Sequence, residues 1–288
     1  MGRVDEAVRR IRALEIQGAN AIARAALAAL AADLDADRAA DGAALAAALS
    51  GARPNEPMLR NLLARFLEVP VPPGGRRARA EELLCGLDED ERRIAATGAG
   101  LVRDGMSVFT HCHSSTAVAI LLEAHRLGRR FRVLNTETRP RYQGRITARE
   151  LAAAGVEVVH MVDAAAKRAL DGADLFLFGA DAVLGSGYLV NKVGTGLFCV
   201  VAARYGVPIY CATHTLKVVR DRADEAVEQR DPKEVWPDAP AGVVVENPAF
   251  DKVSLQYVTA FVTERGLLAD ILAGTPAADA GVASWKDD

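Results

Sequence analysis

The fold is decided by residues 106–135, MSVFTHCHSSTAVAILLEAHRLGRRFRVLN. A short apolar run from Met106 to Phe109 leads into the polar turn 110–116. A helical run follows, and a second β-rich run starts at Phe131 after the stop signal Gly128. This pattern predicts a strand, a crossover helix and a second strand. A strand–helix–strand unit of this kind gives a right-handed crossover between parallel strands. The two strands are therefore predicted to be parallel neighbours.

The same alternation continues toward the C-terminus. The predicted strands are 106–110, 131–135, 156–162, 175–179 and 207–211, with 243–245 as a further strand. The predicted helices between them are 117–127, 147–154, 164–170 and 197–205. Glycines follow these helices as C-terminal stops, at Gly128, Gly155, Gly172 and Gly206. Repeated strand–helix units predict a Rossmann-like α/β domain with a parallel sheet.

Upstream of this region the chain has a helical period. Apolar residues from Ile11 to Ala26 recur mostly every three or four positions, which predicts one amphipathic helix. Further helices are predicted at 43–49, 58–67 and 81–102, with a loop at 69–79. We therefore predict an α/β protein: a helical N-terminal domain with a linker helix at 1–104, then a Rossmann-like catalytic domain at 105–288. Residues 274–288 read as a flexible tail, or less favourably as a tail anchored by Trp285.

Composition limits the class of protein. The 288 residues carry 35 basic and 38 acidic side chains, and 35 − 38 gives a net charge of −3, with no basic excess for nucleic acid. The four cysteines form no paired motif and are typical of reduced thiols in a cytoplasmic protein. The charged N-terminus is unlike a signal peptide, and the apolar run 19–32 is too short for a membrane span.

Polar residues gather where the predicted strands end. Cys112 follows the first strand, the segment 136–139 follows the second, Asp181 follows the strand 175–179, and the pair His214 and Lys217 follows the strand 207–211. In an open parallel sheet, ligands bind beyond the carboxyl ends of the strands. We therefore expect these groups to share one edge of the sheet.

Cys112 lies where a strand turns into a helix, and a helix N-terminus binds anions and lowers the pKa of a nearby thiol. The alternative is a small buried hydrophobe, the interpretation that suits Cys199 and Cys211. Asp181 reads as a proton carrier if buried, or as a simple turn residue. Asn191 and Lys192 read as a phosphate clamp or as a solvated turn.

Two other kinds of site are disfavoured. The sequence GTGLF at 194–198 has half of a dinucleotide fingerprint and no predicted strand before it. His111, Cys112 and His113 are adjacent, so on an extended segment their side chains point to opposite faces, which is unsuited to one metal ion. We therefore expect neither a metal nor an organic cofactor.

Four segments resemble one known superfamily. They are THCHSST (110–116), TETRPRYQGRITARELAAAGV (136–156), GADAVLGSGYLVNKVGT (179–195) and ENPAFD (246–251). They are similar to the initiation factor 2B alpha, beta and delta subunits and to the isomerases of methylthioribose 1-phosphate and ribose 1,5-bisphosphate. The ribose-1,5-bisphosphate isomerases are the nearest in appearance. This resemblance implies a cytoplasmic homo-oligomer, dimer or hexamer, that acts on a phosphorylated pentose in AMP degradation.

The resemblance also implies roles for particular residues. Cys112 and Asp181 correspond to the catalytic acid/base pair of the isomerases, which the regulatory subunits generally lack. Substrate contacts carry over to Gln17, Gly18, Ala19, Asn20, Arg53, Ser114, Ser115, Thr116, Asn191, Lys192 and Lys217. The family usually has arginine where this chain has Gln17. Around Arg53 the family has an Arg-Pro-Thr type motif, and this chain has Asn55 in place of the threonine. The related methylthioribose-1-phosphate isomerase and a non-enzymatic regulatory protein stay as alternatives.

Overall fold

The computed structural model describes residues 2–36, 41–72, 74–220 and 228–276. The chain divides into two compact units, which are described separately. The first comprises Met1–Asp90 and Leu216–Val219, and the second Glu91–Thr215 and Arg220–Asp288. The boundary between them lies inside one long helix, α5 (Arg76–Ala99). In the described part of the chain, no helix is both long and apolar enough to cross a membrane.

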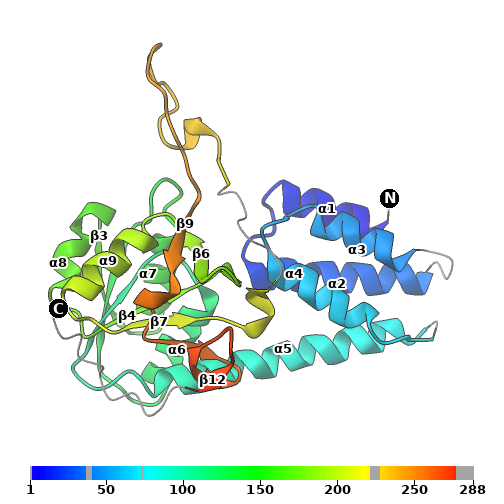
Figure 1. The fold of residues 1–288 in the computed structure, drawn as a ribbon, viewed down its shortest axis with the longest axis horizontal. Helices are drawn as coiled ribbons and strands as arrows, with labels where there is room; N and C mark the ends of the chain where they lie inside the picture. Colours follow the sequence, from blue (N-terminus) through cyan, green and yellow to red (C-terminus); the bar gives the residue numbers. More distant parts are fainter. Residues whose placement is uncertain (1, 37–40, 73, 221–227, 277–288) are drawn as a thin grey trace. The chain divides into compact units, whose positions relative to one another are not determined.

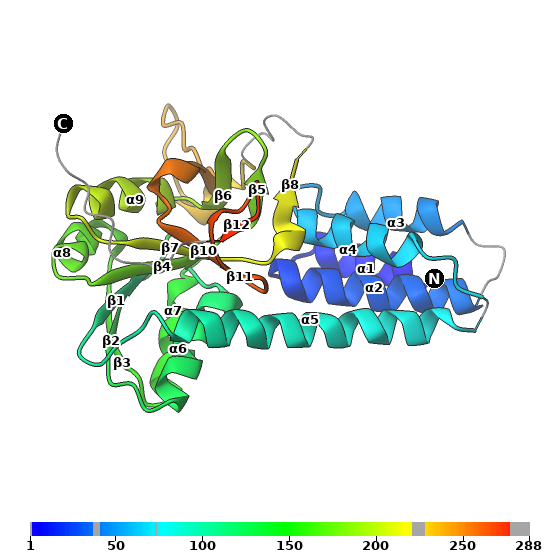
Figure 2. The same ribbon diagram turned by 60° about the horizontal axis from the view of Figure 1, so that its bottom comes forward.

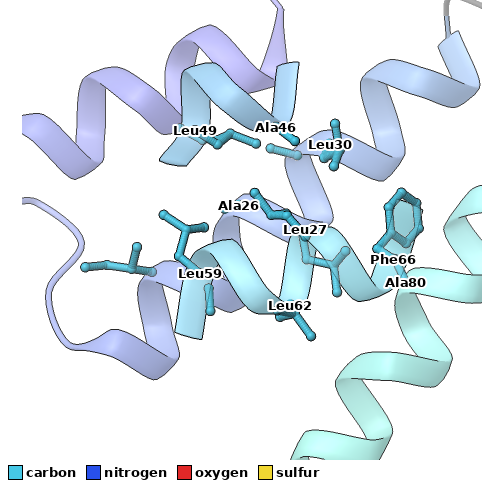
Figure 3. Close-up of a cluster of buried hydrophobic side chains, with 14 of the residues drawn as sticks. Ala26, Leu27, Leu30, Ala46, Leu49, Leu59, Leu62, Phe66 and Ala80 are labelled. Carbon is cyan, nitrogen blue, oxygen red and sulfur yellow. The ribbon is translucent and has the colours of Figure 1, made fainter. Parts of the chain in front are cut away.

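The first unit is a helical bundle around an apolar core. Its helices are α1 (Arg3–Arg12), α2 (Ala19–Ala36), α3 (Gly42–Ser50), α4 (Pro57–Leu67) and the first part of α5. Figure 3 shows Leu27 and Leu30 of α2 facing Leu59, Leu62 and Phe66 of α4 and Leu49 of α3. The short segment η2 (Thr215–Lys217) and β8 (Val218–Val219) return to this unit, where Asn61 Nδ2 donates to Leu216 O at 2.7 Å.

The single helix predicted through Ile11 and Ala26 is wrong. The chain leaves the helix after Arg12 and re-enters it at Ala19. Two left-handed residues, Leu14 with φ 58° and Gly18 with φ 86°, make the break. The periodicity misled because alanines and isoleucines continue on both sides of the break, so the apolar spacing is nearly preserved. Helix α5 also starts at Arg76, inside the predicted loop.

The second unit contains a twisted, mostly parallel sheet, which confirms the predicted α/β class. Its strands are β1 (Ser107–Thr110), β2 (Arg132–Thr136), β3 (Glu157–Met161), β4 (Leu175–Gly179), β7 (Ile209–Ala212), β10 (Ala260–Thr263), β11 (Gly266–Asp270) and β12 (Thr275–Pro276). The order is β12-β11-β10-β7-β4-β1-β2-β3, and the run from β10 to β3 is parallel. Residues 277–288, including Trp285, lie outside the described part.

Helices cover both faces of this sheet (Figure 2). One face carries α6 (Ser115–Arg126) and α7 (Gly144–Ala153), and the other carries α8 (Ala166–Leu170) and α9 (Thr195–Arg204). Alternate residues of β1 pack on opposite faces of the sheet. Val108 joins the apolar cluster with Ile120 and Leu121 of α6, whereas Phe109 makes edge contacts with Phe198 of α9 at a centroid distance of 5.6 Å.

A small antiparallel sheet was not predicted. It contains β5 (Ala182–Leu184), β6 (Tyr188–Lys192) and β9 (Phe250–Ser254). These strands were missed because β5 is only three residues long, polar residues interrupt β6 and β9, and glycines lie in the turn between β5 and β6. The predicted strand 243–245 is wrong, since that segment has no ladder partner and Val244 is 87% exposed. It lies in an arm, residues 228–249, that extends away from the sheets of the second unit (Figure 1).

Candidate active site

The carboxyl ends of β7, β4, β1 and β2 are adjacent in the sheet, so the turns that follow them lie side by side. Ser114, in the turn after β1, lies directly over the end of β4. A Cβ built on Gly179 would be 2.3 Å from Ser114 Oγ, so only glycine fits there. The next residues after Gly179 lead to Asp181. The predicted convergence of the β1 and β4 turns is therefore present.

Cys112 is partly buried in the turn after β1, with its backbone in the left-handed region at φ 67°. The pKa of its thiol is raised to about 12, mainly by burial and to a smaller extent by the negative charges of Asp181 and Asp163. The backbone N–H of His113 and the Lys192 ammonium act in the opposite direction but are weaker. The thiol therefore keeps its proton at neutral pH.

The predicted lowering of this pKa by the helix N-terminus is wrong for the free protein. Cys112 precedes the N-cap residue Ser114 by two positions, outside the first turn of α6. The Ser114 hydroxyl also accepts the Ala117 N–H at 3.3 Å, which satisfies one of the helix's free donors internally. Desolvation of the thiolate outweighs the remaining field of the helix.

Lys192 is buried beside this thiol. Burial is the main cause that lowers its pKa, while electrostatic interactions with Cys112 and Asp181 raise it. The backbone of Asp181 is joined to the strand that contains Lys192, since the Asp181 N–H donates to Val190 O of β6 at 2.9 Å. Cys112, Asp181 and Lys192 therefore lie within electrostatic reach of one another, brought together by β1, β4 and β6.

Asn191 is buried and orders the turn into α9. Its Nδ2 donates to Thr195 Oγ1 at 2.9 Å, and Thr195 Oγ1 donates to Lys192 O at 2.6 Å. Asp251 Oδ2 accepts the N–H groups of Gly194 at 2.8 Å and Gly196 at 2.9 Å. A strand, β6, does precede GTGLF, contrary to the prediction, but a carboxylate already occupies the anion position at the start of α9.

Both histidines of the turn are tied into it. Val193 O can only accept, so His111 Nε2 carries the proton of the 3.0 Å bond, and His111 Nδ1 accepts from Thr136 Oγ1 at 2.7 Å. His113 Nδ1 bonds Thr147 Oγ1 at 3.1 Å. Among the described residues, no group of three or more His, Cys, Asp or Glu side chains could hold a metal ion.

The remaining candidates divide between the two units. Ser115 is exposed and Thr116 partly buried in the first turn of α6, in the second unit. The first unit contains Lys217 in η2, the segment Gln17–Asn20 before and at the start of α2, and Arg53 after α3. Gln17 is exposed, and its Nε2 donates to Leu14 O at 2.8 Å, so it folds back on its own turn.

The structure adds polar side chains that the sequence did not single out. Gln143, in the turn after β2, has a buried Oε1 with no hydrogen-bond partner among the described residues. Such an atom is costly unless a ligand or water serves it. The guanidinium of Arg145 stacks on Tyr142 at 3.8 Å from the ring centroid. Tyr142, Gln143 and Arg145 all lie in TETRPRYQGR (136–145). This motif carries the resemblance to the family, so the sequence did contain a signal for these three residues.

Comparisons with known proteins identify relatives of this chain. The sequence profile of the Initiation factor 2 subunit family matches residues 15–270. The ribose 1,5-bisphosphate isomerase of Haloterrigena turkmenica is 42% identical over 204 residues, and the match spans 66% of this chain but only 62% of that protein. The ribose 1,5-bisphosphate isomerase of Methanocaldococcus jannaschii is 32% identical over 93% of this chain and 92% of its own length.

Solved structures show the same fold. A Pyrococcus horikoshii structure described as translation initiation factor eIF-2B has a TM-score of 0.81 and 30% identity, covering 92% of this chain and 96% of that one. The 5-methylthioribose 1-phosphate isomerase of the same organism has a TM-score of 0.79 and 25% identity, covering 94% of this chain and 86% of that one.

Proposed function

This chain belongs to the Initiation factor 2 subunit family, and from that premise we propose that it is a sugar-phosphate isomerase converting ribose 1,5-bisphosphate to ribulose 1,5-bisphosphate. The observation that carries the proposal is the grouping of Cys112, Asp181 and Lys192 at the carboxyl edge of the sheet. A thiol and a carboxyl group beside a buried cation are suited to proton transfer on an anionic substrate.

The first half-reaction opens the sugar ring. Asp181, as a carboxylic acid, donates its proton to the ring oxygen while the bond from that oxygen to C1 breaks. Cys112, as a thiolate, takes the proton from C2, and the electron pair of the C2–H bond becomes the C1–C2 double bond. The intermediate is an enol that still carries the C1 phosphate.

The second half-reaction forms the ketone and returns Asp181 and Cys112 to their starting protonation states. The C2 hydroxyl of the enol returns a proton to the Asp181 carboxylate and becomes the ketone. The Cys112 thiol gives its proton to C1, which becomes a CH₂ group bearing the phosphate. Asp181 is then protonated and Cys112 ionised again, so no oxidant, metal or organic cofactor is required by the proton balance.

The raised pKa of Cys112 sets a condition on this mechanism. The thiol holds its proton in the free protein, whereas the first step needs a thiolate and a protonated carboxyl group. Moving that one proton from Cys112 to Asp181 produces the required pair without any exchange with solvent. Lys192 favours the step, because its positive charge stabilises the thiolate.

Substrate phosphates are assigned to the remaining polar groups. The proposal gives Ser114, Ser115, Thr116, Asn191 and Lys192 of the second unit to one part of the substrate. The family resemblance also assigns substrate contacts to Arg53, Lys217 and the segment Gln17–Asn20, which belong to the first unit. Cationic and hydroxyl groups are the usual partners of phosphate oxygens.

The test is a turnover assay of purified protein with ribose 1,5-bisphosphate and methylthioribose 1-phosphate in parallel. Cys112→Ser and Asp181→Asn should each reduce turnover on the order of a hundredfold or more while the protein stays folded. Cys199→Ala is the matched control, because Cys199 is also a buried thiol whose pKa is raised to about 12, but it lies in α9. Full turnover in either site variant contradicts the assignment.

A second activity is favoured by a specific observation. The structural likeness to a 5-methylthioribose 1-phosphate isomerase covers 94% of this chain, and that protein's named substrate has no second phosphate. Preferred turnover of methylthioribose 1-phosphate would replace the first proposal. Absence of turnover on both sugars, together with a stable complex with an initiation factor, would favour a regulatory protein instead.

The remaining expectations are also proposals. A homo-oligomer and a role in AMP degradation follow from the resemblance alone, and a cytoplasmic location follows from the resemblance and from the unpaired cysteines. Light scattering on purified protein tests the first. The product of the turnover assay bears on the last.

A further inference from the structure

The backbone of Cys112 is in an unusual conformation. Its φ of 67° is in the left-handed region, which residues other than glycine rarely adopt. Such a conformation is strained and persists only where neighbouring groups enforce it. Identifying those neighbours shows which residues set the position of the Cys112 side chain.

Both backbone polar groups of Cys112 are held by threonine side chains. The Cys112 N–H donates to Thr138 Oγ1 at 3.0 Å, and the Cys112 carbonyl accepts from Thr147 Oγ1 at 3.0 Å. Thr138 is fully buried and is itself left-handed, with φ 64°. A β-branched residue in this region is a strong outlier, so Thr138 also needs a group that holds it.

That group is Asp163, the first residue of η1 (Asp163–Ala165) after β3. Its two carboxylate oxygens accept two successive backbone N–H groups. Oδ1 accepts from Thr138 at 2.8 Å, and Oδ2 accepts from Arg139 at 2.7 Å. A continuous series of hydrogen bonds therefore leads from Asp163 through Thr138 to the backbone of Cys112.

We infer that Asp163 and Thr138 are positioning residues for Cys112: they fix its left-handed backbone and so hold its Sγ beside Asp181 and Lys192. The inference rests on the proposed function for the role of Cys112, but the geometry that it concerns exists without substrate. Neither residue is a catalytic residue in this assignment, because the polar atoms of both are engaged with backbone N–H groups.

The experiment measures the thiol directly. Cys112 is alkylated with iodoacetamide across a range of pH and quantified by peptide mass spectrometry, with the exposed Cys85 as the reference in the same sample. The charged groups that face Cys112 are Asp181, Lys192 and Asp163, together with the N–H of His113. The variants are Thr138→Val, which keeps the shape and removes the hydroxyl, Thr138→Ser, which keeps the hydroxyl, and Asp163→Asn.

Release of the Cys112 backbone should admit water to the thiol and weaken the burial that raises its pKa. In Thr138→Val, alkylation near neutral pH should be faster by about tenfold for each unit by which the pKa falls. Asp163→Asn should also be faster, but part of its effect comes from loss of the Asp163 charge, which itself raises the pKa of Cys112, so the neutral variant Thr138→Val decides the positioning role. Thr138→Ser should behave as the unaltered protein. With substrate, kcat should fall on the order of a hundredfold in the first two variants, with a smaller change in KM.

The control is Asp33→Asn in the first unit. Asp33 accepts the backbone N–H groups of Arg3 at 3.0 Å and Val4 at 2.9 Å, so its carboxylate makes the same kind of paired contact as Asp163. This variant should lose stability but leave the alkylation of Cys112 unchanged. Asp163→Asn should change both.

The positioning role is overturned if Thr138→Val alkylates at Cys112 as the unaltered protein does, even when its melting temperature falls. The proposed function fails separately, by absence of turnover on every pentose phosphate tested. In that case the alkylation comparison still decides the positioning role.

Discussion

At the scale of single residues, His111 joins three turns of the site. Its Nε2–H donates a hydrogen bond to Val193 O, and its Nδ1 accepts one from Thr136 Oγ1. Its ring packs edge-on against Phe198, with 4.7 Å between the ring centroids. Gly194 leaves room for the ring, since a Cβ there would lie 3.3 Å from His111 Nε2. The ring is thus held as one neutral tautomer, and burial lowers its pKa from the usual 6.5.

This lowered pKa predicts how stability depends on pH. In the unfolded chain His111 gains a proton as pH falls through about 6.5, whereas in the folded protein it stays neutral to a lower pH. The unfolded state then binds more protons than the folded state, so the free energy of unfolding falls as pH falls. For each histidine the fall is at most about 1.4 kcal/mol per pH unit. His113, whose pKa burial also lowers, adds to the effect.

Urea unfolding at about pH 7, 6 and 5 measures this slope, above the range where carboxylates of ordinary pKa titrate. His111→Gln should be less stable at neutral pH and should show a flatter slope, and the double change with His113→Gln should be flatter still. An unchanged slope in both variants would contradict the burial of neutral histidines.

Single residues also show where sequence reasoning stops. The position of Cys112 after β1 and of Asp181 after β4 follows from the alternation of strands and helices. The protonation of Cys112 does not, because it depends on the burial of the thiol and on the charges of Asp181 after β4, Lys192 in β6 and Asp163 after β3. Thr138 was expected at this edge as part of the segment 136–139, but its role and that of Asp163 were not, since nothing in their types or spacing signals the left-handed turn that they hold.

At the scale of elements, the arm 228–249 is anchored at its base by one ionic network. Arg230 forms a two-point contact with Glu234, at 2.9 Å from Nε to Oε2 and 2.7 Å from Nη2 to Oε1. Arg141, in the turn after β2, reaches the same carboxylate at 3.2 Å. The Arg230 guanidinium is the main cause that lowers the pKa of Glu234 to about 2.

Glu234→Gln should therefore loosen the arm. The amide cannot match the charge-assisted contacts with Arg230 and Arg141, so we expect a loss of about 1.5–3 kcal/mol in local stability. Hydrogen exchange should become faster in residues 228–249. Glu246→Gln removes the same charge from an exposed position of the same arm and should leave exchange unchanged. Equal exchange in the two variants would show that the network does not anchor the arm.

Elements differed in how well the sequence predicted them. The strand Leu175–Gly179 matches its prediction because it is a continuous buried apolar run bounded by polar residues. The hairpin β5–β6 was missed, since Gly185 and Gly187 and the half-exposed Tyr188 break both apolar periods. Gly185 has its own reason, as a Cβ there would lie 2.5 Å from Arg220 O.

At the scale of the whole molecule, each of the two units has apolar packing of its own and its own set of candidate residues. The helical unit contains Gln17, Arg53 and Lys217, and the α/β unit contains Cys112 and Asp181. Under the proposed function, the α/β unit supplies the proton transfers common to the family's isomerases. Choice between sugars then falls to residues that meet the group at C5, and Gln17 is where this chain departs from the usual arginine.

Replacement of that residue is the sharpest test of substrate choice. Gln17→Arg supplies a guanidinium that can form charge-assisted hydrogen bonds with a second phosphate, which methylthioribose 1-phosphate lacks. The ratio of kcat/KM for ribose 1,5-bisphosphate to that for methylthioribose 1-phosphate should rise about tenfold or more, the effect of one hydrogen bond to a charged group. Gln17→Ala is the matched control and should lower both values without a comparable change in their ratio. A Gln17→Arg ratio that stays constant or falls would mean that Gln17 does not meet the C5 substituent, and that substrate choice is made by other residues.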